Sequence, residues 1–417
     1  MVTLDSKLRL AFVVQRYGQE IGGGAELLCR EVAEHLVPYA DVSVLTTCAQ
    51  DYATWENTYP VGQTEISGVR VHRFAVDYPR RAAKFQSLAR QMALTVHTPL
   101  DEHAWMLEQG PISSDLLKHI DKYADYYDAF LFVTYLYATT YFGIQMVPNK
   151  AILIPAAHDE PPLYYSVFRS VFHLPRHLIF NTDAERRLVH SVFGNERIPW
   201  SVIGTGVERP AQTDPRRFRE KYGIADDFLL YVGRLDESKN VPELLDYFQR
   251  HKKENPSSLK LVLMGKGPYS VPTAGDIIPL GYVSDQDKFD ALGAAQVLVL
   301  PSRYESLSIA ILEAWMMSCP VLVNGECDVL VEQCLRSNGG LYYRGYDEFS
   351  MALGVMPANS GLRRQLASAG AAFTELEYAW PMVEWRYLQV LYRYLGGGQK
   401  ERMRGTGPVD VAVNWYP

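Results

Sequence analysis

Two glutamates and a stretch of small residues mark a place in the second half of the chain that could bind a phosphate group. Glu305 and Glu313 enclose Ser306-Leu307-Ser308, which follows the apolar run 297–300 and opens a predicted helix. Backbone amides at a helix start have no partner inside the helix, so these three could donate hydrogen bonds to phosphate oxygens. The carboxylates would suit hydroxyl groups on both sides of a diphosphate. The alternative is that Ser308 caps the helix and Glu305 is a surface charge.

A glycine and two cations follow another apolar run. Gly233 and Arg234 come directly after residues 228–232, and Lys239 follows five positions after Arg234. Arginine offers a forked contact to phosphate, and lysine offers a point charge. The alternative is a solvated loop in which both cations pair with the two acidic residues that lie between them.

Two further patterns could carry chemistry. His158 follows a predicted strand at 151–154, and loops at strand ends often hold functional groups, although a lone histidine is more often structural. Asp285-Gln286-Asp287 has the spacing of a metal-binding pair. Acidic residues at a helix start also complement the helix dipole, so no metal site is predicted there.

Three glycine loops resemble nucleotide-binding fingerprints but fail them. Leu27 breaks the dinucleotide pattern after 22–24, and Arg209 breaks it after 204–206. The loop 265–267 lacks the hydroxyl residue of a P-loop. These loops therefore predict either a close approach of the backbone to a ligand or tight turns between strands and helices.

The elements that must position these residues alternate between strands and helices. An apolar strand at 8–14, a helix at 25–36 and a strand at 41–46 predict a right-handed crossover unit. Further strands are predicted at 129–133, 151–154, 178–181 and 201–203, and the pattern restarts at 228–232, 259–264, 276–280, 297–300 and 320–324. Two α/β units joined near 204–214 are the simplest account. A final helix, 381–395, carries Trp385, Leu388, Leu391 and Tyr392 at helical spacing.

Composition limits the classes of function. The chain has 417 residues, 47% of them hydrophobic, with 41 Lys and Arg against 48 Asp and Glu. A net charge of −7 disfavours nucleic acid as a partner, since such binding requires phosphate neutralisation. The amino terminus lacks a signal-peptide pattern, and the uncharged stretch 129–147 is interrupted by polar residues, so we expect a buried strand and a following element there. Five cysteines without a C-x-x-C pair suit a reducing cytoplasm.

Together, these motifs resemble those of a known family. In order they are Gly22-Gly23-Gly24-Ala25-Glu26, His158-Asp159-Glu160, Gly233-Arg234 with Lys239, Gly265-Lys266-Gly267-Pro268, Leu280-Gly281-Tyr282-Val283, and Glu305 with Glu313. The chain is similar to the retaining, nucleotide-sugar-dependent glycosyltransferases of the GT-B fold, specifically the large family four group. The resemblance covers almost all of the chain and is densest from 228 to 343. The segment 306–308 departs from the commoner family pattern; because its expected contacts are backbone amides, activity should survive, with an altered sugar preference. The segment 324–330 also departs from the family pattern, at the contacts beneath the donor sugar.

The resemblance implies an α/β protein with two Rossmann-like domains that face a cleft. Residues 1–205 would form the acceptor domain, and residues 206–379 the donor domain. Residues 380–417 would hold a helix that crosses back to the first domain, and a tail. The resemblance also implies that no metal ion or other cofactor is required.

The resemblance also assigns roles to single residues. Arg234 and Lys239 would neutralise the donor diphosphate, Glu305 would contact the donor sugar, and Glu313 would hold the ribose. His158 would contact the sugar near the reacting carbon. The remaining expected contacts are backbone contacts of Gly233, Ser306, Leu307 and Ser308 with the diphosphate, of Val283 with the base, and of a closing loop at Gly23 and Gly24.

The expected activity is transfer of a sugar from a nucleotide-diphosphate donor, UDP-linked, to an acceptor hydroxyl in polysaccharide or glycolipid assembly. The alternatives are a sugar-nucleotide epimerase of similar fold and a non-catalytic nucleotide-sugar binding protein. The protein is expected in the cytoplasm. A basic stretch could face a lipid-linked acceptor or the inner membrane surface, with a solvated helix and hairpin as the alternative. It consists of Arg70, Arg73, Arg80, Arg81, Lys84 and Arg90.

Overall fold

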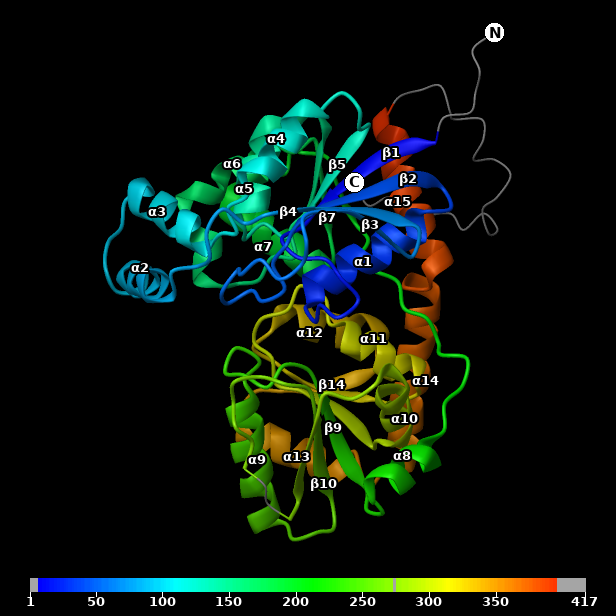
Figure 1. The fold of residues 1–417 in the computed structure, drawn as a ribbon. Coiled ribbons are helices and arrows are strands. Elements are labelled where there is room, and N and C mark those ends of the chain that lie inside the picture. The colour runs from blue at the N-terminus through cyan, green and yellow to red at the C-terminus, as the bar shows by residue number, and fades with distance from the viewer. Residues whose placement is uncertain (1–6, 273–274, 396–417) are drawn as a thin grey trace.

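Two separate sheets organise the protein (Figure 1). The structure, a computed structural model, describes residues 7–272 and 275–395. Each sheet carries helices on both faces and forms the centre of its own lobe. The lobes are stacked, with the carboxyl-terminal edge of each sheet turned toward the other lobe. The predicted fold class, two Rossmann-like units of the GT-B type, is confirmed.

The first sheet has eight strands in the order β3-β4-β2-β1-β5-β6-β7-β8, and all neighbours are parallel except β3 and β4. Its inner strands are short apolar runs with no exposed residue, as expected for a sheet covered on both faces. The strands are β1 Leu8–Val13, β2 Ala40–Thr47, β3 Gly62–Ile66, β4 Val69–Phe74, β5 Ala129–Val133, β6 Ala151–Ile154, β7 His177–Phe180 and β8 Trp200–Val202.

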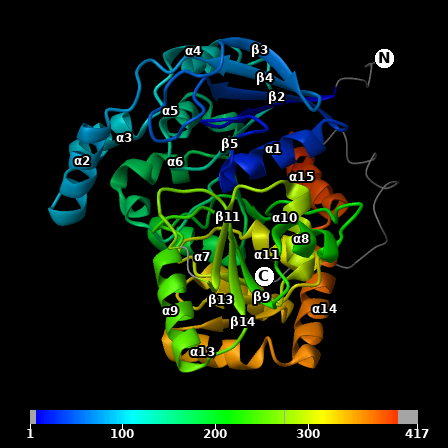
Figure 2. The ribbon, with the colours of Figure 1, turned by 60° about the horizontal axis from the view of Figure 1, so that its bottom comes forward.

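Helices cover both faces of this sheet, and one helical hairpin, α2 with α3, extends from the side of the lobe (Figures 1 and 2). The helices are α1 Gly24–Leu36, α2 Ala82–Leu94, α3 Pro99–Gln109, α4 Ser114–Lys122, α5 Ala138–Met146, α6 Arg169–His173 and α7 Asp183–Phe193, with short 3-10 turns at Pro148–Lys150, Pro161–Tyr164 and Ser166–Phe168. The stretch 129–147 therefore forms a buried strand and a following helix, as predicted.

The second sheet has six parallel strands in the order β11-β10-β9-β12-β13-β14. They are β9 Phe228–Val232, β10 Lys260–Met264, β11 Ile277–Gly281, β12 Val297–Leu300, β13 Val321–Asn324 and β14 Gly340–Tyr343. The helices of this lobe are α8 Pro215–Tyr222, α9 Val241–Glu254, α10 Asp285–Ala294, α11 Ile309–Met316, α12 Asp328–Ser337, α13 Tyr346–Val355 and α14 Ser360–Glu377. The domain boundaries stay predictions; the last strand of the first sheet ends at Val202, and the second sheet begins at Phe228.

Helix α15, Trp380–Leu395, leaves the second lobe and packs on the first (Figure 1). Val383, Tyr387 and Leu391 are buried in the same core as strands β1 and β5, and the Tyr387 hydroxyl donates to the carbonyl of Gly204 at 3.0 Å. The predicted face is confirmed in part: Leu391 is buried and Leu388 packs against this core, whereas Trp385 and Tyr392 are only partly buried. The predicted tail lies outside the described residues.

The described residues bear on two expectations about the cellular setting. All five cysteines are unpaired and buried. Within the described ranges, no helix combines the length and the apolar character needed to cross a bilayer.

Candidate active site

The predicted cations and the first glutamate lie on loops that leave neighbouring strands. β9 and β12 are hydrogen-bonded neighbours at the centre of the second sheet. Arg234 and Lys239 follow β9, and Glu305 follows β12. Because parallel strands end at the same edge, the two loops meet at the edge that faces the first lobe. Ligands bind at such edges in open α/β sheets.

Two ion pairs organise these loops. The Lys239 ammonium lies 2.6 Å from Oε1 of Glu305, and Arg234 pairs with Asp236. Asp236 also accepts hydrogen bonds from the Ser238 hydroxyl at 2.8 Å and from the Lys239 amide at 2.9 Å. Burial would raise the pKa of Asp236, but these partners outweigh burial and lower it. Arg234 therefore forms an ion pair within its own loop, as the alternative interpretation of the sequence expected. Lys239 instead pairs with Glu305 on the loop after β12.

Arg234 also touches the first lobe. Its guanidinium carbon lies 4.9 Å from the centre of the Tyr52 ring, in a cation–π contact. Arg16, which follows β1, lies 5.3 Å from the same ring and forms a 2.5 Å ion pair with the buried Glu26. Tyr52 therefore connects an arginine of each lobe. Burial would lower the pKa of Arg234, but Asp236 and Tyr52 raise it, so the guanidinium stays charged.

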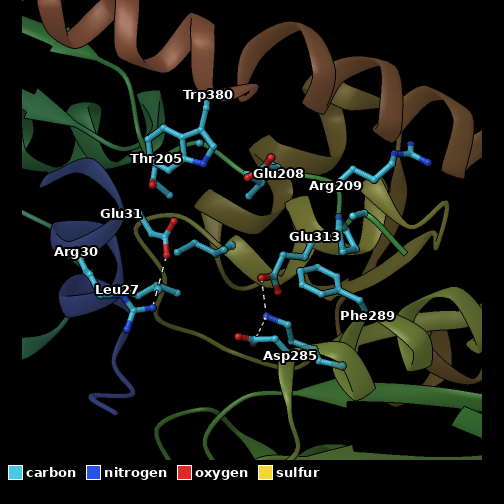
Figure 3. Close-up of a pocket in the computed structure, with 16 residues that line it drawn as sticks. Leu27, Arg30, Glu31, Thr205, Glu208, Arg209, Asp285, Phe289, Glu313 and Trp380 are labelled. Atoms are coloured by element: carbon cyan, nitrogen blue, oxygen red, sulfur yellow. Dashed lines mark hydrogen bonds and ion pairs between the residues drawn. The ribbon is translucent and has the colours of Figure 1, made fainter. Parts of the chain in front are cut away.

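Glu313 lines a cavity of about 420 Å³ between the lobes (Figure 3). Its carboxylate lies 2.7 Å from the ammonium of Lys288, which also pairs with Asp285 at 3.2 Å. Burial raises the pKa of Glu313 although Lys288 opposes this shift. The other walls of the cavity come from both lobes and from α15; they include Leu27, Arg30, Glu31, Thr205, Arg209, Phe289 and Trp380.

The Asp285 and Asp287 pair is used for contacts within the protein. Asp285 pairs with Lys288, and Asp287 accepts from Lys221 at 2.8 Å and from the Ser284 hydroxyl at 2.7 Å. Among the described residues, no three His, Cys, Asp or Glu side chains come together as metal ligands.

The segment before α11 joins the two lobes. Thr182 Oγ1 donates to the carbonyl of Ser306 at 3.0 Å, and Asn181 Nδ2 lies 3.3 Å from Ser306 Oγ. The prediction of three open amides is wrong for Ser308, because its amide donates to Oε1 of Gln333 at 3.2 Å. The amides of Ser306 and Leu307 have no such partner within the described part of the chain. Two donors therefore remain for an anion.

His158 lies in the loop after β6, partly buried, with Nδ1 3.7 Å from a carboxylate oxygen of Glu160. The preceding residue, Ala157, is fixed in place by a hydrogen bond to a buried carboxylate. The buried Glu185 accepts the amide of Ala157 through one oxygen and the amide of Asn181 through the other, both at 2.6 Å. Burial outweighs these hydrogen bonds and raises the pKa of Glu185 to about 8.

Two glycine positions are explained by close contacts inside the protein. Gly265 has a φ of +141°, and a side chain there would overlap the carbonyl of Gly233, so the loops after β9 and β10 require it. A side chain at Gly23 would clash with the Glu26 carboxylate, whereas one at Gly24 would meet nothing within 4 Å. Gly24 therefore faces open space.

Val283 lies between β11 and α10 and packs partly against the hydrophobic core of the second lobe.

The basic stretch is divided between two places. Arg70 pairs with Asp41 at 2.6 Å, and Arg73 is buried in the hairpin β3–β4, whereas Arg90 is exposed on α2. The stretch is therefore not one continuous basic surface.

Sequence reasoning missed four residues of this region. They are Tyr52, Glu185, Lys288 and Arg16. Lys288 could have been found from the sequence, because a lysine three positions after Asp285 on a helix can form an ion pair with that carboxylate. Nothing in the sequence indicates that Tyr52 meets Arg234, since the contact joins separate lobes.

The fold and the donor-lobe pattern together define the class of this protein. Residues 226–352 match the family model described as Glycosyl transferases group 1. The chain as a whole has the two-lobed fold of the GT-B glycosyltransferases.

Individual known proteins agree with this class. The chain is 24% identical over 408 residues to an uncharacterized glycosyltransferase of Methanocaldococcus jannaschii, covering 89% of this chain and 95% of the relative. It is 32% identical over 115 residues to the O-antigen chain mannosyltransferase B of Escherichia coli, covering 25% of this chain and 30% of that one. The solved structure of HepE from Anabaena in complex with UDP-glucose superposes with a TM-score of 0.68 at 14% identity, covering 93% of this chain and 100% of HepE.

Proposed function

We propose that this glycosyltransferase moves a sugar from a UDP-linked donor to an acceptor hydroxyl, with retention of the anomeric configuration and without a divalent metal ion. The observation that supports this proposal most is the meeting of Arg234, Lys239 and Glu305 at the sheet edge that faces the first lobe, with the Lys239 to Glu305 distance of 2.6 Å. The UDP-glucose complex of HepE, which has the same fold, supports the choice of donor.

The cations act on the leaving group. Negative charge on the diphosphate grows as the bond to the sugar breaks, so Arg234 and Lys239 stabilise the transition state more than the bound donor. The amides of Ser306 and Leu307 add two donors to the phosphate oxygens. These groups supply the positive charge that a metal ion would otherwise provide.

The remaining residues position the donor. Glu305 accepts hydrogen bonds from sugar hydroxyls, Glu313 from the ribose, and backbone atoms at Val283 contact the base. The open space at Gly24 lets the loop after β1 approach the diphosphate. His158 contacts the sugar beside the reacting carbon.

The acceptor attacks from the face that the diphosphate leaves. The acceptor oxygen forms a bond to the anomeric carbon as the bond from that carbon to the phosphate oxygen breaks. The departing phosphate oxygen takes the acceptor proton, so no enzymic nucleophile is needed. The match to the O-antigen chain mannosyltransferase B supports an acceptor in polysaccharide or glycolipid assembly.

A panel of nucleotide sugars tests the proposal. Only ligands that bind the folded protein raise its melting temperature, and the best of them should release free nucleotide when an acceptor is present. Arg234→Ala should lower this release by more than about a hundredfold, because the leaving diphosphate loses a cation that stabilises the transition state. Each factor of ten in rate corresponds to roughly 1.4 kcal/mol. NMR of the product should show the donor's anomeric configuration, and EDTA should leave turnover unchanged. An inverted product, an isomerised donor without acceptor, or loss of turnover in EDTA would contradict the proposal.

A further inference from the structure

Arg80 is a partly buried arginine without a carboxylate partner. It lies in the loop after β4, where its Nη2 donates to the backbone carbonyl of Gln109 at 2.5 Å and to the side-chain oxygen of the same residue at 3.1 Å. Its Nε is enclosed by protein atoms and has no partner. Its Nη1 is not enclosed, and it forms no hydrogen bond or ion pair with any residue that the structure describes. One end of the guanidinium therefore remains available to a ligand.

The surroundings of Arg80 make its charge unfavourable in the free protein. The guanidinium carbon lies 5.0 Å from the centre of the Trp55 ring and 4.5 Å from the centre of the Phe85 ring. Burial lowers the pKa of Arg80, and its electrostatic partners, Asp51 among them, oppose this shift only in part. An arginine keeps its proton even so, and a partly buried charge without a counter-ion costs free energy. An anion beside Nη1 would remove that cost.

The other arginines at the mouth of the cleft differ from Arg80 in this respect. Arg16 forms its ion pair with the buried Glu26, and Arg234 forms its ion pair with Asp236. Both of these charges are therefore neutralised inside the protein, whereas the charge of Arg80 meets only the carbonyl and amide oxygens of one glutamine.

Arg80 lies on the first-lobe side of the cleft. β4, β2 and β1 are hydrogen-bonded parallel neighbours, so the loops after them meet at the edge of the first sheet that is turned toward the second lobe (Figure 1). Tyr52 follows β2, and Tyr137 follows β5, the next strand in the sheet. Burial acts to lower the pKa of both Arg80 and Arg234, and in both cases Tyr52 and Tyr137 oppose it. These two tyrosines are therefore near a cation from each lobe.

The fold of this loop does not use the free nitrogen of Arg80. The Arg80 amide donates to the carbonyl of Thr54 at 2.6 Å, and Trp55 Nε1 donates at 2.7 Å to the same Gln109 carbonyl that Nη2 contacts. The contacts that hold the loop thus involve the backbone and Nη2, and Nη1 has no structural role.

We propose that Arg80 binds an anionic group of the acceptor, a phosphate or a carboxylate, on the first-lobe side of the cleft. This inference rests on the proposed function and names the class of acceptor that the proposed reaction uses. A guanidinium offers forked, charge-assisted hydrogen bonds, which suit both kinds of anion. The donor diphosphate is assigned to Arg234 and Lys239, so the negative groups of donor and acceptor are held by different cations.

Inorganic phosphate tests the site by binding alone. UDP at saturation fills the donor site, and phosphate is then titrated while the melting temperature is followed. Phosphate stabilises most proteins weakly because it is excluded from their surface, so the matched control is Arg90→Gln, which changes an exposed arginine on α2. We expect a saturable rise in the unchanged protein and in Arg90→Gln, and only the weak, linear rise in Arg80→Gln. Responses of the same size and form in all three proteins would overturn the inference.

Three acceptors that share one sugar test the role of Arg80 in turnover. They are methyl glucoside, methyl glucuronide and glucose 1-phosphate, with nucleotide release as the readout. The better of the two charged acceptors should have a kcat/KM at least about tenfold above that of the neutral glucoside, and its identity distinguishes carboxylate from phosphate. Arg80→Gln should remove this preference mainly through KM, and Arg80→Lys should restore part of it. Loss of kcat/KM for all three acceptors alike would show that Arg80 is only structural.

The two experiments separate this inference from the proposed function. If UDP does not raise the melting temperature, the proposed function fails, and the phosphate titration repeated without UDP still decides the role of Arg80. Where none of the three acceptors reacts, the titration alone decides. If Arg80→Gln does not fold, Arg80→Lys replaces it and should bind phosphate more weakly than the unchanged protein, because it keeps the charge but not the fork. Unchanged phosphate binding in that variant would contradict the inference.

Discussion

The ammonium of Lys239 lies 2.6 Å from a carboxylate oxygen of Glu305. The two side chains come from loops after neighbouring strands, so the pair connects the group proposed for the diphosphate with the group proposed for the sugar. In the proposed complex, Lys239 turns to the phosphate and Glu305 accepts sugar hydroxyls. The ion pair therefore keeps both side chains at the site before a donor arrives.

Lys239→Ala should lower kcat/KM by at least about a hundredfold, because the leaving group loses a cation that acts most strongly in the transition state. The measurement is nucleotide release at varied donor concentration. The control is Lys253→Ala, an exposed lysine on α9, which should leave kcat/KM unchanged. A loss in Lys239→Ala no larger than that in the control would contradict the assigned role.

Tyr52→Ala should lower kcat/KM by about tenfold, whereas Tyr52→Phe should stay near the unchanged protein, because a cation–π contact needs the ring and not the hydroxyl. Arg9 lies 4.7 Å from the ring of Tyr126 in a similar contact far from the site, so Tyr126→Ala is the matched control. If Tyr52→Phe were as impaired as Tyr52→Ala, the hydroxyl rather than the ring would be the working group.

Lys288→Met should weaken binding of UDP, and the loss should be larger at pH 6 than at pH 9. Burial raises the pKa of Glu313, and without Lys288 the carboxyl will protonate more readily and accept fewer hydrogen bonds from the ribose. As the pH rises, Glu313 ionises and affinity should recover. Calorimetric titration with UDP measures this, with Lys118→Met, which removes an exposed ion pair on α4, as the control. A loss independent of pH would refute this role of Lys288.

Glu185→Gln should destabilise the protein by ~1–3 kcal/mol, because an amide nitrogen would face a backbone amide that now donates to a carboxyl oxygen. Burial raises the pKa of Glu185 from 4.5 to about 8, so the folded state holds this proton more tightly than the unfolded state does. The stabilisation is complete below the ordinary pKa and is lost as the pH rises through about 8.

Urea midpoints at pH 5, 6.5 and 8.5 test this linkage. The gap between the unchanged protein and Glu185→Gln should narrow as the pH rises, since the variant cannot titrate at this position. A gap that stayed constant or widened as the pH rose would show that Glu185 is ionised in the folded state across the range.

Most strands were predictable because they are short apolar runs between turns. The predicted strands 129–133 and 228–232 agree with β5 and β9 to the residue. The convergence of Lys239 and Glu305 could also be predicted, because parallel strands bring the loops that follow them to one edge of the sheet. The pairing of α2 with α3 was not predicted, since α2 buries only Met92 and therefore shows no clear apolar face in the sequence.

Long-range contacts limited the prediction of the site. Ser308 was expected to offer its amide to phosphate, but a glutamine 25 positions away occupies it. The inward face of α15 was predicted only in part, with Leu388 and Leu391 but without Val383 and Tyr387, because the helix packs on a lobe whose strands lie far away in the sequence. Local spacing cannot say which side of such a helix its distant neighbour will cover.

Helix α15 completes the hydrophobic core of the first lobe with residues that the ribosome adds after the whole second lobe. During synthesis, the strands around β1 and β5 therefore emerge without one of their covering layers. Maturation of the first lobe must wait until residues 380–395 have left the exit tunnel. A gene fragment that ends after β8 would encode a lobe with an open apolar face, and expression of that lobe alone would require the helix to be appended.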